Sequence, residues 1–334
     1  MNSSTSSSET DPGWGRSLAA CMGTLIGAAM LVLALMVVVD PYDSGKLGLL
    51  GIDGVDNRLT QITAASRARD PNFNAAILGN STAQMIEPEA LSRATSLRFV
   101  QLYTTGSAPR EQLAVLDFFL RNHKQVGALV IAADPGWCVH ARPKEEGAPF
   151  PYWLYDTSVV IYAVRLISWQ AIEQAFQRLG IGLGWRQRMN PDGFVSYEDI
   201  WPPGQFKEAN APRDPVRAVS ARAAFPEIRA LQDVVRKLQA DVPIVIIVPP
   251  TFAATVPISG TDLALERGAC DAALKAVIAG RARSNFISYR VDNALTRDRD
   301  NFVDFIHYRP KLARRIGQGI IASLRDGESA KIDF

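Results

Sequence analysis

The chain has 334 residues, of which 47% are hydrophobic and 21% are charged, and its formal net charge is +2. This length and composition suit one large α/β domain, and the near-neutral charge provides no basic excess that would indicate nucleic-acid binding. With only three cysteines, the chain is not a disulfide-rich scaffold.

The N-terminal region predicts a membrane anchor. Residues 1–16 are rich in serine, threonine and glycine and are expected to be a disordered cytoplasmic tail. Residues 17–39 carry no charge and are long enough to span a bilayer as one helix. Arg16 precedes this run, and Asp40 and Asp43 follow it. The positive-inside rule therefore predicts a single-pass protein whose soluble part is periplasmic or extracellular.

A cleaved signal peptide is the alternative to an anchor. The apolar run is long, however, and no clear small-x-small site follows it. The segment from Leu18 to Cys21 imitates a lipoprotein box, but here the apolar run follows the cysteine instead of preceding it. The sequence favours an uncleaved anchor.

Strand and helix patterns alternate through the soluble part. Residues 40–70 predict a linker and a lead-in helix, and residues 71–334 predict one domain. Continuous apolar runs predict buried strands at 75–78, 97–103, 127–133, 243–248 and 286–291. Helical spacing or position predicts helices at 57–69, 88–94, 109–123, 157–179, 226–240, 260–282 and 311–324. This alternation predicts a doubly wound parallel sheet with helices on both faces. A mostly helical insertion is expected at about 138–222.

Two cysteines, Cys138 and Cys270, would lie outside the cytoplasm, where disulfides are stable. Their positions in the sequence do not decide between a bridge and two free thiols. Cys21 lies within the predicted anchor.

One stretch, AAILGNSTAQM from Ala75 to Met85, predicts a buried strand, a tight turn at Gly79 and a serine at the carboxyl edge of the sheet. Ser81 would then open a segment that could be helical, where free backbone N–H groups favour negative charge. Such a serine is either a nucleophile or a simple helix cap.

A second motif, NFVDFIHYRP from Asn301 to Pro310, places Asp304 three residues before His307. Together with the early Gly-Asn-Ser turn, it resembles the SGNH (GDSL-like) hydrolases, whose last block is Asp-x-x-His. The resemblance implies a flavodoxin-like sheet and a catalytic set of Ser81, Asp304 and His307. It also implies an oxyanion site at the backbone N–H groups of Ser81 and Gly106, although Gly106 can equally be a turn glycine. The Asp-Pro-Tyr segment at 40–42 and the residues after His307 are similar to membrane-anchored members that act in polysaccharide O-acetylation.

The chain departs from this family at two positions. Asn80 stands where the family usually has aspartate, and Asp134 stands where an asparagine normally donates to the oxyanion. An ionised Asp134 would repel an oxyanion, so we expect it to orient a substrate hydroxyl or to point away from the site.

Further substrate-binding candidates lie nearby in the sequence. Trp137 and the insertion aromatics Tyr152, Trp153, Tyr155 and Trp201 would either stack on sugar rings or pack the insertion onto the core. Arg110 would bind an anion or lie solvated in the first turn of its helix.

These features predict an O-acyl esterase or acyltransferase that modifies a cell-surface glycan through an acyl-serine. The alternative is a catalytically inactive scaffold with the same fold. The resemblance implies an integral membrane acyltransferase or export partner, and no cofactor or metal is expected.

Overall fold

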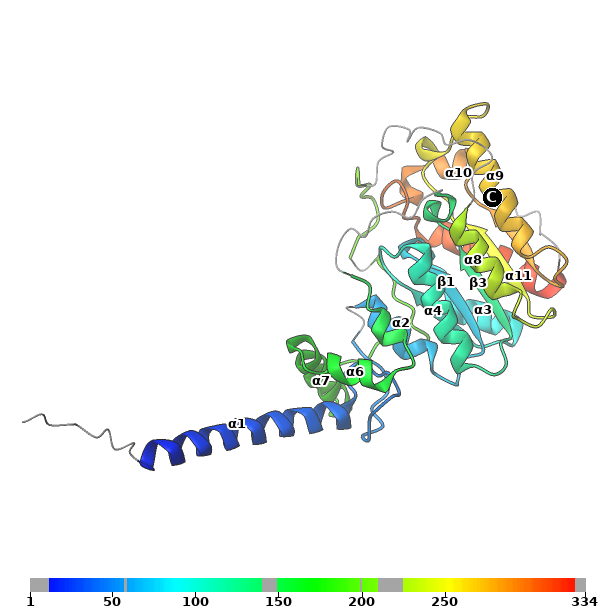
Figure 1. Ribbon diagram of the computed structural model, residues 1–334. Helices are drawn as coiled ribbons and strands as arrows, with labels where there is room; N and C mark the ends of the chain where they lie inside the picture. Colours follow the sequence, from blue (N-terminus) through cyan, green and yellow to red (C-terminus); the bar gives the residue numbers. More distant parts are fainter. Residues whose placement is uncertain (1–11, 57–58, 140–148, 199, 210–224, 328–334) are drawn as a thin grey trace, which may run out of the picture.

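A five-stranded parallel sheet in the order β2-β1-β3-β4-β5 forms the centre of the domain (Figure 1). The computed structural model describes residues 12–56, 59–139, 149–198, 200–209 and 225–327. The strands are β1 (Ala75–Gly79), β2 (Phe99–Tyr103), β3 (Ala128–Ala132), β4 (Ile244–Val248) and β5 (Asn285–Ser288). Each pair of neighbours is parallel, which confirms the predicted α/β class and parallel sheet.

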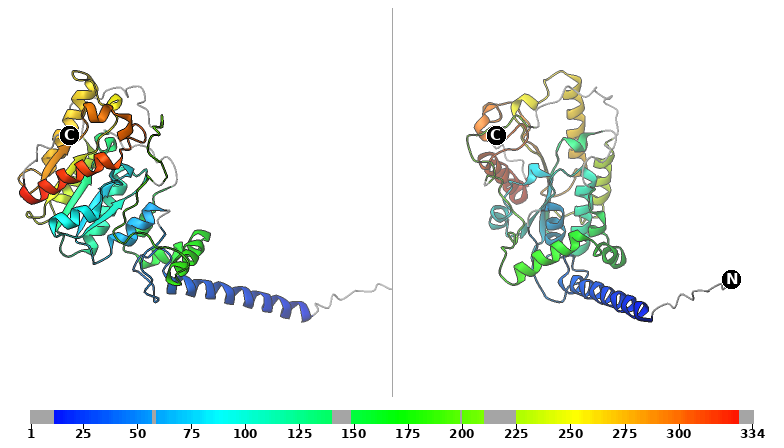
Figure 2. Two further views of the ribbon diagram at one scale, coloured as in Figure 1. Left: turned by 180° about the vertical axis from the view of Figure 1, so that it is seen from behind. Right: turned by 90° about the vertical axis from the view of Figure 1, so that its left-hand side faces the viewer.

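Helices cover both faces of this sheet because alternate strand residues point to opposite sides. Ala76 and Leu78 of β1 belong to the core cluster on one face, and Ala75 and Ile77 belong to the cluster on the other. The first face carries α2 (Thr60–Ala68), α4 (Pro109–Asn122), α8 (Pro226–Val235) and α9 (Asp262–Val277). The second carries α3 (Pro88–Thr95) and α11 (Pro310–Asp326), which are seen in front of the sheet from behind (Figure 2, left).

Most of the predicted element boundaries agree with the structure to within a few residues because the sequence marks them. Pro88, Pro109, Pro226 and Pro310 each lie in the first turn of a helix, where the missing N–H costs no hydrogen bond. Two helices end five residues earlier than predicted: α8 ends at Val235 and not at residue 240, and α9 ends at Val277 and not at residue 282. The short elements are α10 (Ala294–Arg297), η1 (Ser81–Ala83), η2 (Pro135–Cys138), η3 (Ala253–Thr255) and η4 (Arg299–Asn301).

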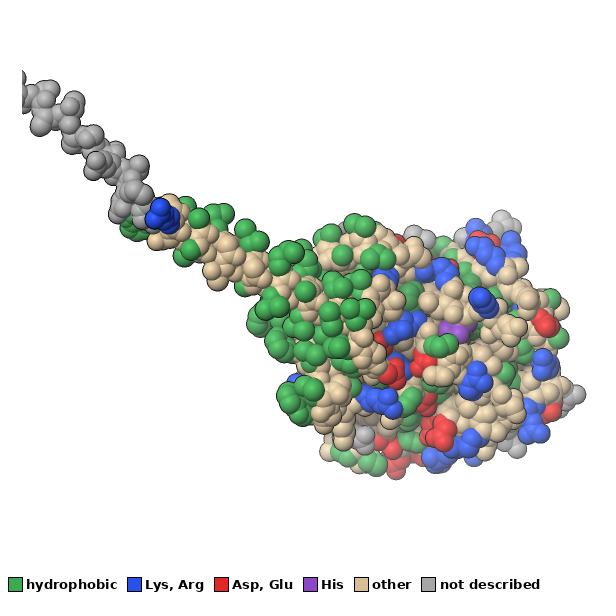
Figure 3. Space-filling view, turned by 90° about the horizontal axis from the view of Figure 1, so that it is seen from below, with side chains coloured by type: hydrophobic (Ala, Val, Ile, Leu, Met, Phe, Trp, Pro, Cys, Tyr) green, Lys and Arg blue, Asp and Glu red, His purple; other side chains and the backbone are tan. Residues whose placement is uncertain are grey.

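The N-terminal helix α1 (Pro12–Val39) projects from the domain (Figures 1 and 3). Within it, Trp14–Val39 is long and apolar enough to cross a membrane. The helix begins at Pro12, so residues 12–16 are helical and the prediction of disorder is wrong for them. Residues 1–11, which were also predicted to be disordered, lie outside the described residues.

A buried ionic cluster fixes the end of α1 to the domain. The Asp43 carboxylate is within 3.2 Å of Arg67 and within 3.0 Å of Arg178, and it also pairs with Arg69. Asp43 and Arg67 are each about 1% exposed. The segment 40–56, predicted as a link, is therefore held in place by charged contacts.

The predicted insertion contains α5 (Tyr152–Tyr155), α6 (Val159–Arg165) and α7 (Trp169–Gly182), followed by irregular chain. We predicted one helix over 157–179, which is wrong because the chain breaks before α7. There the Ser168 side chain accepts a hydrogen bond from Ala171 N–H at 3.1 Å and caps the new helix. Residues 140–148 and 210–224 of the predicted insertion lie outside the described residues.

Candidate active site

Ser81 follows the carboxyl end of β1, which lies between β2 and β3 in the sheet. After β1 the chain forms β2 on one side of it and then β3 on the other side. A side chain at Gly79 would place its Cβ 2.7 Å from Ala83 Cβ, so only glycine allows this exit from the strand. Asn80 caps the turn, because its Oδ1 accepts from Thr82 N–H at 3.0 Å. Ser81 opens a 3-10 turn of three residues, so the dipole of a long helix does not act on it.

Asp304 and His307 lie in the loop between η4 and α11. An antiparallel bridge between Phe302 and Tyr308 closes this loop. The Asp304 Oδ1 atom accepts hydrogen bonds from the backbone N–H groups of Ile306 and His307, both at 2.9 Å. These contacts fix the carboxylate relative to the His307 ring.

The three predicted catalytic side chains meet in one line. His307 Nδ1 lies 2.8 Å from Asp304 Oδ2, and His307 Nε2 lies 2.9 Å from Ser81 Oγ. Because an ionised carboxylate only accepts hydrogen bonds, Nδ1 carries the proton and Nε2 is free to accept from the serine hydroxyl. This is the arrangement that a nucleophile, a base and a group orienting the base require.

Electrostatics keep the carboxylate of this line ionised. Burial by itself would raise the pKa of Asp304. The hydrogen bond and charge of His307, together with the two backbone N–H groups, outweigh burial and hold the pKa of Asp304 below its usual value. The Asp304 and His307 side chains are 6% and 12% exposed, so this pair is largely shielded from water.

Two aromatic rings from the insertion pack beside His307. The ring centres of Tyr197 and Trp201 lie 5.9 Å and 6.1 Å from that of His307. Lys207 Nζ lies 4.9 Å from the centre of the Trp201 ring. Arg309 holds the segment down by donating to the carbonyl of Trp201 at 3.0 Å. Trp201 was predicted from the sequence as a site residue, but Tyr197, Lys207 and Arg309 were not, because no local pattern connects residues 197–207 to the loop after η4.

Two backbone N–H groups follow the carboxyl ends of the neighbouring strands β1 and β2, those of Ser81 and Gly106. Thr104 N–H donates to the Gly79 carbonyl at 3.0 Å, which joins the exit of β2 to that of β1. Gly106 follows with φ +68°, a conformation that favours glycine, and the space where its side chain would lie is open. Within the described residues, neither the Ser81 nor the Gly106 N–H donates a hydrogen bond to the protein.

Asp134 is occupied by structural contacts. Its Oδ1 accepts from Gly136 N–H at 2.7 Å, and its Oδ2 accepts from Gln112 Nε2 at 3.0 Å. Gln112 in turn accepts from Trp137 Nε1 at 3.2 Å and donates to the Ser107 carbonyl at 3.3 Å. Both carboxylate oxygens therefore accept hydrogen bonds within the protein, one from η2 and one from α4.

Burial raises the pKa of Asp134, and the hydrogen bond from Gln112 is the largest influence that opposes this shift. Trp137 is 1% exposed, so its ring is part of the core and presents no face to a ligand. The prediction that Trp137 stacks on a substrate sugar is therefore wrong. Arg110 is the second residue of α4 and is partly exposed.

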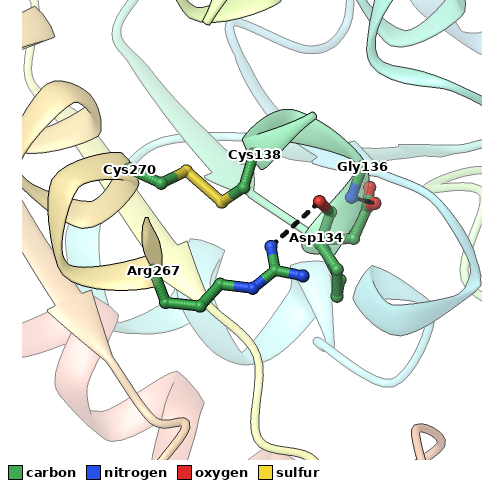
Figure 4. The surroundings of a disulfide bond; sticks show 6 residues. Asp134, Gly136, Cys138, Arg267 and Cys270 are labelled. Atoms are coloured by element: carbon green, nitrogen blue, oxygen red, sulfur yellow. Dashed lines mark hydrogen bonds between the residues drawn. A yellow bond between two sulfur atoms is a disulfide. The ribbon is translucent and has the colours of Figure 1, made fainter. Parts of the chain in front are cut away.

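A disulfide joins this region to α9. Cys138 of η2 is bonded to Cys270, with 5.5 Å between their Cα atoms (Figure 4). Beside it, Arg267 donates to the Pro135 carbonyl at 3.2 Å. The question that the sequence left open is thus answered in favour of a bridge. Cys21 is free and exposed.

Among the residues that the structure describes, no group of three or more His, Cys, Asp or Glu side chains is placed to hold a metal ion. In comparisons with known proteins, no protein-family model and no curated protein matches the chain.

Proposed function

We propose that this protein is a membrane-anchored, extracytoplasmic serine O-acyl esterase or acyltransferase of SGNH type, acting on a cell-surface glycan. The observation that carries the proposal is the hydrogen-bonded line from Ser81 Oγ through His307 to Asp304. The sheet order β2-β1-β3-β4-β5, with the serine after β1, supports the assignment.

The geometry supports a two-step acyl transfer. In the first step, Ser81 Oγ attacks the ester carbonyl while His307 Nε2 takes the serine proton. The N–H groups of Ser81 and Gly106 would donate to the oxyanion, each contributing about 3 kcal/mol to lowering the barrier. His307 then gives its proton to the leaving alkoxide oxygen, and the acyl group remains on Ser81.

The acyl-serine then reacts with an acceptor hydroxyl. Its oxygen attacks the acyl carbonyl while His307 takes its proton, and the proton finally returns to Ser81 Oγ. Water as acceptor gives hydrolysis, and a sugar hydroxyl gives transfer. The partly exposed Trp201 ring beside His307 favours a sugar, because an aromatic face with polar neighbours suits sugar stacking.

The location follows from three features. Helix α1 has the length and hydropathy of a membrane span. Arg16 precedes the uncharged run and Asp40 follows it, which favours a cytoplasmic N-terminus. The Cys138–Cys270 disulfide suits an oxidising compartment. A tethered domain of this kind would work beside an integral membrane acyl donor or exporter.

A catalytically inactive scaffold is the second candidate function. The observation that favours it is Asp134, whose engaged carboxylate provides no side-chain donor for an oxyanion at the end of β3.

Hydrolysis of an aryl acetate by the purified full-length protein, with and without a glycan acceptor, separates the candidates. An enzyme loses at least about 10³-fold of its activity in Ser81→Ala, whereas Ser259→Ala, at an exposed position, retains it. Acetyl groups on the acceptor identify transfer. Equal background rates for the wild type and Ser81→Ala would contradict the enzyme and support the scaffold.

A further inference from the structure

A band of large apolar side chains is exposed where α1 meets the domain, as the hydrophobic surface in Figure 3 shows. We refer to six residues of α6, α7 and their flanking segments as the α6–α7 apolar face. Their exposed fractions lie between 62% and 80%, and they are Val160, Val164, Ile167, Trp169, Phe176 and Trp185.

The pattern of α6 shows that this face is not an ordinary water-exposed surface. Tyr162 and Leu166 are buried in the domain, at 0% and 2% exposure. On the other side, Val160, Val164 and Ile167 follow the i, i+4, i+7 spacing of one helix face. A helix that packs on a core usually presents polar residues to water. Here both sides are apolar.

Contacts fix the α6–α7 apolar face next to the end of α1. Arg178 of α7 donates to the carbonyl of Val39, the last residue of α1, at 2.6 Å. The same guanidinium lies 3.0 Å from Asp43. Met36 and Val39 are buried at 0% and 2% exposure, so the last turn of α1 belongs to the domain.

The free part of α1 matches the thickness of a bilayer. Its uncharged residues are exposed from Ser17 to Ala34, which at 1.5 Å per residue spans about 27 Å. This length is close to the thickness of the hydrocarbon core of a bilayer, about 30 Å. The outer surface of the membrane would therefore lie where α1 enters the domain, level with the α6–α7 apolar face.

We propose that the α6–α7 apolar face binds the interfacial region of the same bilayer that α1 crosses. The inference depends on the proposed anchor, since α1 sets the height of the membrane surface. Trp169 and Trp185 suit this depth because tryptophan concentrates at membrane interfaces. Two attachments, α1 and this face, would hold the domain in one orientation and keep Ser81 at a fixed height above the lipid.

Spin labels in the full-length protein test this surface. In a Cys21→Ser background, one nitroxide is placed at Ile167→Cys and a matched control at Ile258→Cys. Both residues are 78% exposed, but Ile258 lies outside the face. A third label at Leu25→Cys reports on α1. In liposomes of phosphatidylcholine and phosphatidylglycerol, collisions with oxygen report lipid, and collisions with a water-soluble nickel chelate report water.

We expect the oxygen-to-nickel collision ratio at Ile167 to be several-fold higher than at Ile258 and to approach the ratio at Leu25. A label at Leu25 in lipid with Ile167 as wet as Ile258 would overturn the surface and leave the anchor intact. Water around Leu25 would overturn both. Protection of Ile167 in native membranes but not in liposomes would also overturn the proposal, because the occupant would then be a protein.

Discussion

His307 Nε2 lies 2.9 Å from Ser81 Oγ, although 226 positions separate the two residues in the sequence. The contact exists because β1 and the loop before α11 end at the same edge of the sheet. Asp304 Oδ2 lies 2.8 Å from Nδ1 on the other side of the ring, the order that the proposed acid, base and nucleophile require. In this order, loss of any one member disables the other two.

The first prediction concerns Asp304→Asn. The amide keeps the shape of the side chain but does not stabilise a protonated His307 and favours the wrong tautomer of the ring. We expect kcat for an aryl ester to fall about 10³- to 10⁴-fold, with little change in KM. Glu89→Gln, in an exposed ion pair on α3, serves as the control and should retain its activity. A kcat within a few-fold of the wild type would show that Asp304 has no role in the chemistry.

The second prediction concerns stability against pH. In the folded protein, burial would raise the pKa of Asp304, but the contacts with His307 and with two backbone N–H groups hold it below the usual aspartate value of 3.8. The contribution of this carboxylate to stability is therefore complete above that value and is lost as the pH falls through the folded pKa. Urea unfolding should show the difference between wild type and Asp304→Asn shrinking below about pH 4. A difference that stays constant down to pH 2 would mean that the pKa is not depressed.

The third prediction concerns Asp134→Asn. The new amide NH₂ group at position 134 would face the Gln112 NH₂ group, and two donors cannot form a hydrogen bond. If the Gln112 amide rotates to present its oxygen, its NH₂ group faces the Trp137 Nε1–H donor instead. Loss of this network costs about 1–3 kcal/mol. Because burial raises the pKa of Asp134, removal of the charge offsets part of the cost. We expect a net loss near 1 kcal/mol in denaturant unfolding and no gain in ester hydrolysis.

Gln112→Leu provides the control for this network. Combined with Asp134→Asn, it should cost less than the sum of the two single changes, since both remove the same hydrogen bond. Increased hydrolysis in Asp134→Asn would instead mean that position 134 faces the oxyanion.

The fourth prediction concerns the Cys138–Cys270 bridge. It joins η2 to α9 across 132 positions in the sequence. Replacing both cysteines with serine should lower the free energy of unfolding by about 2–5 kcal/mol. Cys21→Ser, at the free and exposed cysteine, should leave the Tm unchanged. If dithiothreitol lowers the Tm of Cys21→Ser but not that of the double variant, the bridge is responsible. An equal Tm for wild type and double variant would contradict its role.

Strands β1, β3 and β4 could be predicted because they are buried on both faces, which makes each a continuous apolar run such as Ile244–Val248. The edge strand β5 is half-buried and begins and ends with the polar residues Asn285 and Ser288. The proximity of Ser81, Asp304 and His307 could also be predicted, because Ser81 follows a strand and the other two residues share one motif. The break before α7 could not be predicted, because apolar residues continue across it and the capping role of Ser168 is evident only from its hydrogen bond with Ala171 N–H. The local sequence therefore indicates buried strands and short motifs, but not where a long apolar helix breaks.

Long-range packing accounts for the remaining differences. The roles of Tyr197 and Trp201 depend on how the insertion lies over His307. Asp134 could be assigned only when Gln112, from α4, was seen to donate to it. The sequence predicts that Asp134 lies at the edge of the sheet, but its hydrogen-bond partner comes from α4, which is distant in the sequence.

Labelling with a fluorophosphonate tests whether Ser81 is a nucleophile, because the probe reacts only with a serine whose hydroxyl is activated by a base. The full-length protein in detergent is treated with the probe, digested and mapped by mass spectrometry. We expect one adduct on Ser81, absent in Ser81→Ala and strongly slowed in Asp304→Asn, with no adduct on the exposed Ser259. An unlabelled Ser81 in a protein that is folded by circular dichroism would contradict this expectation.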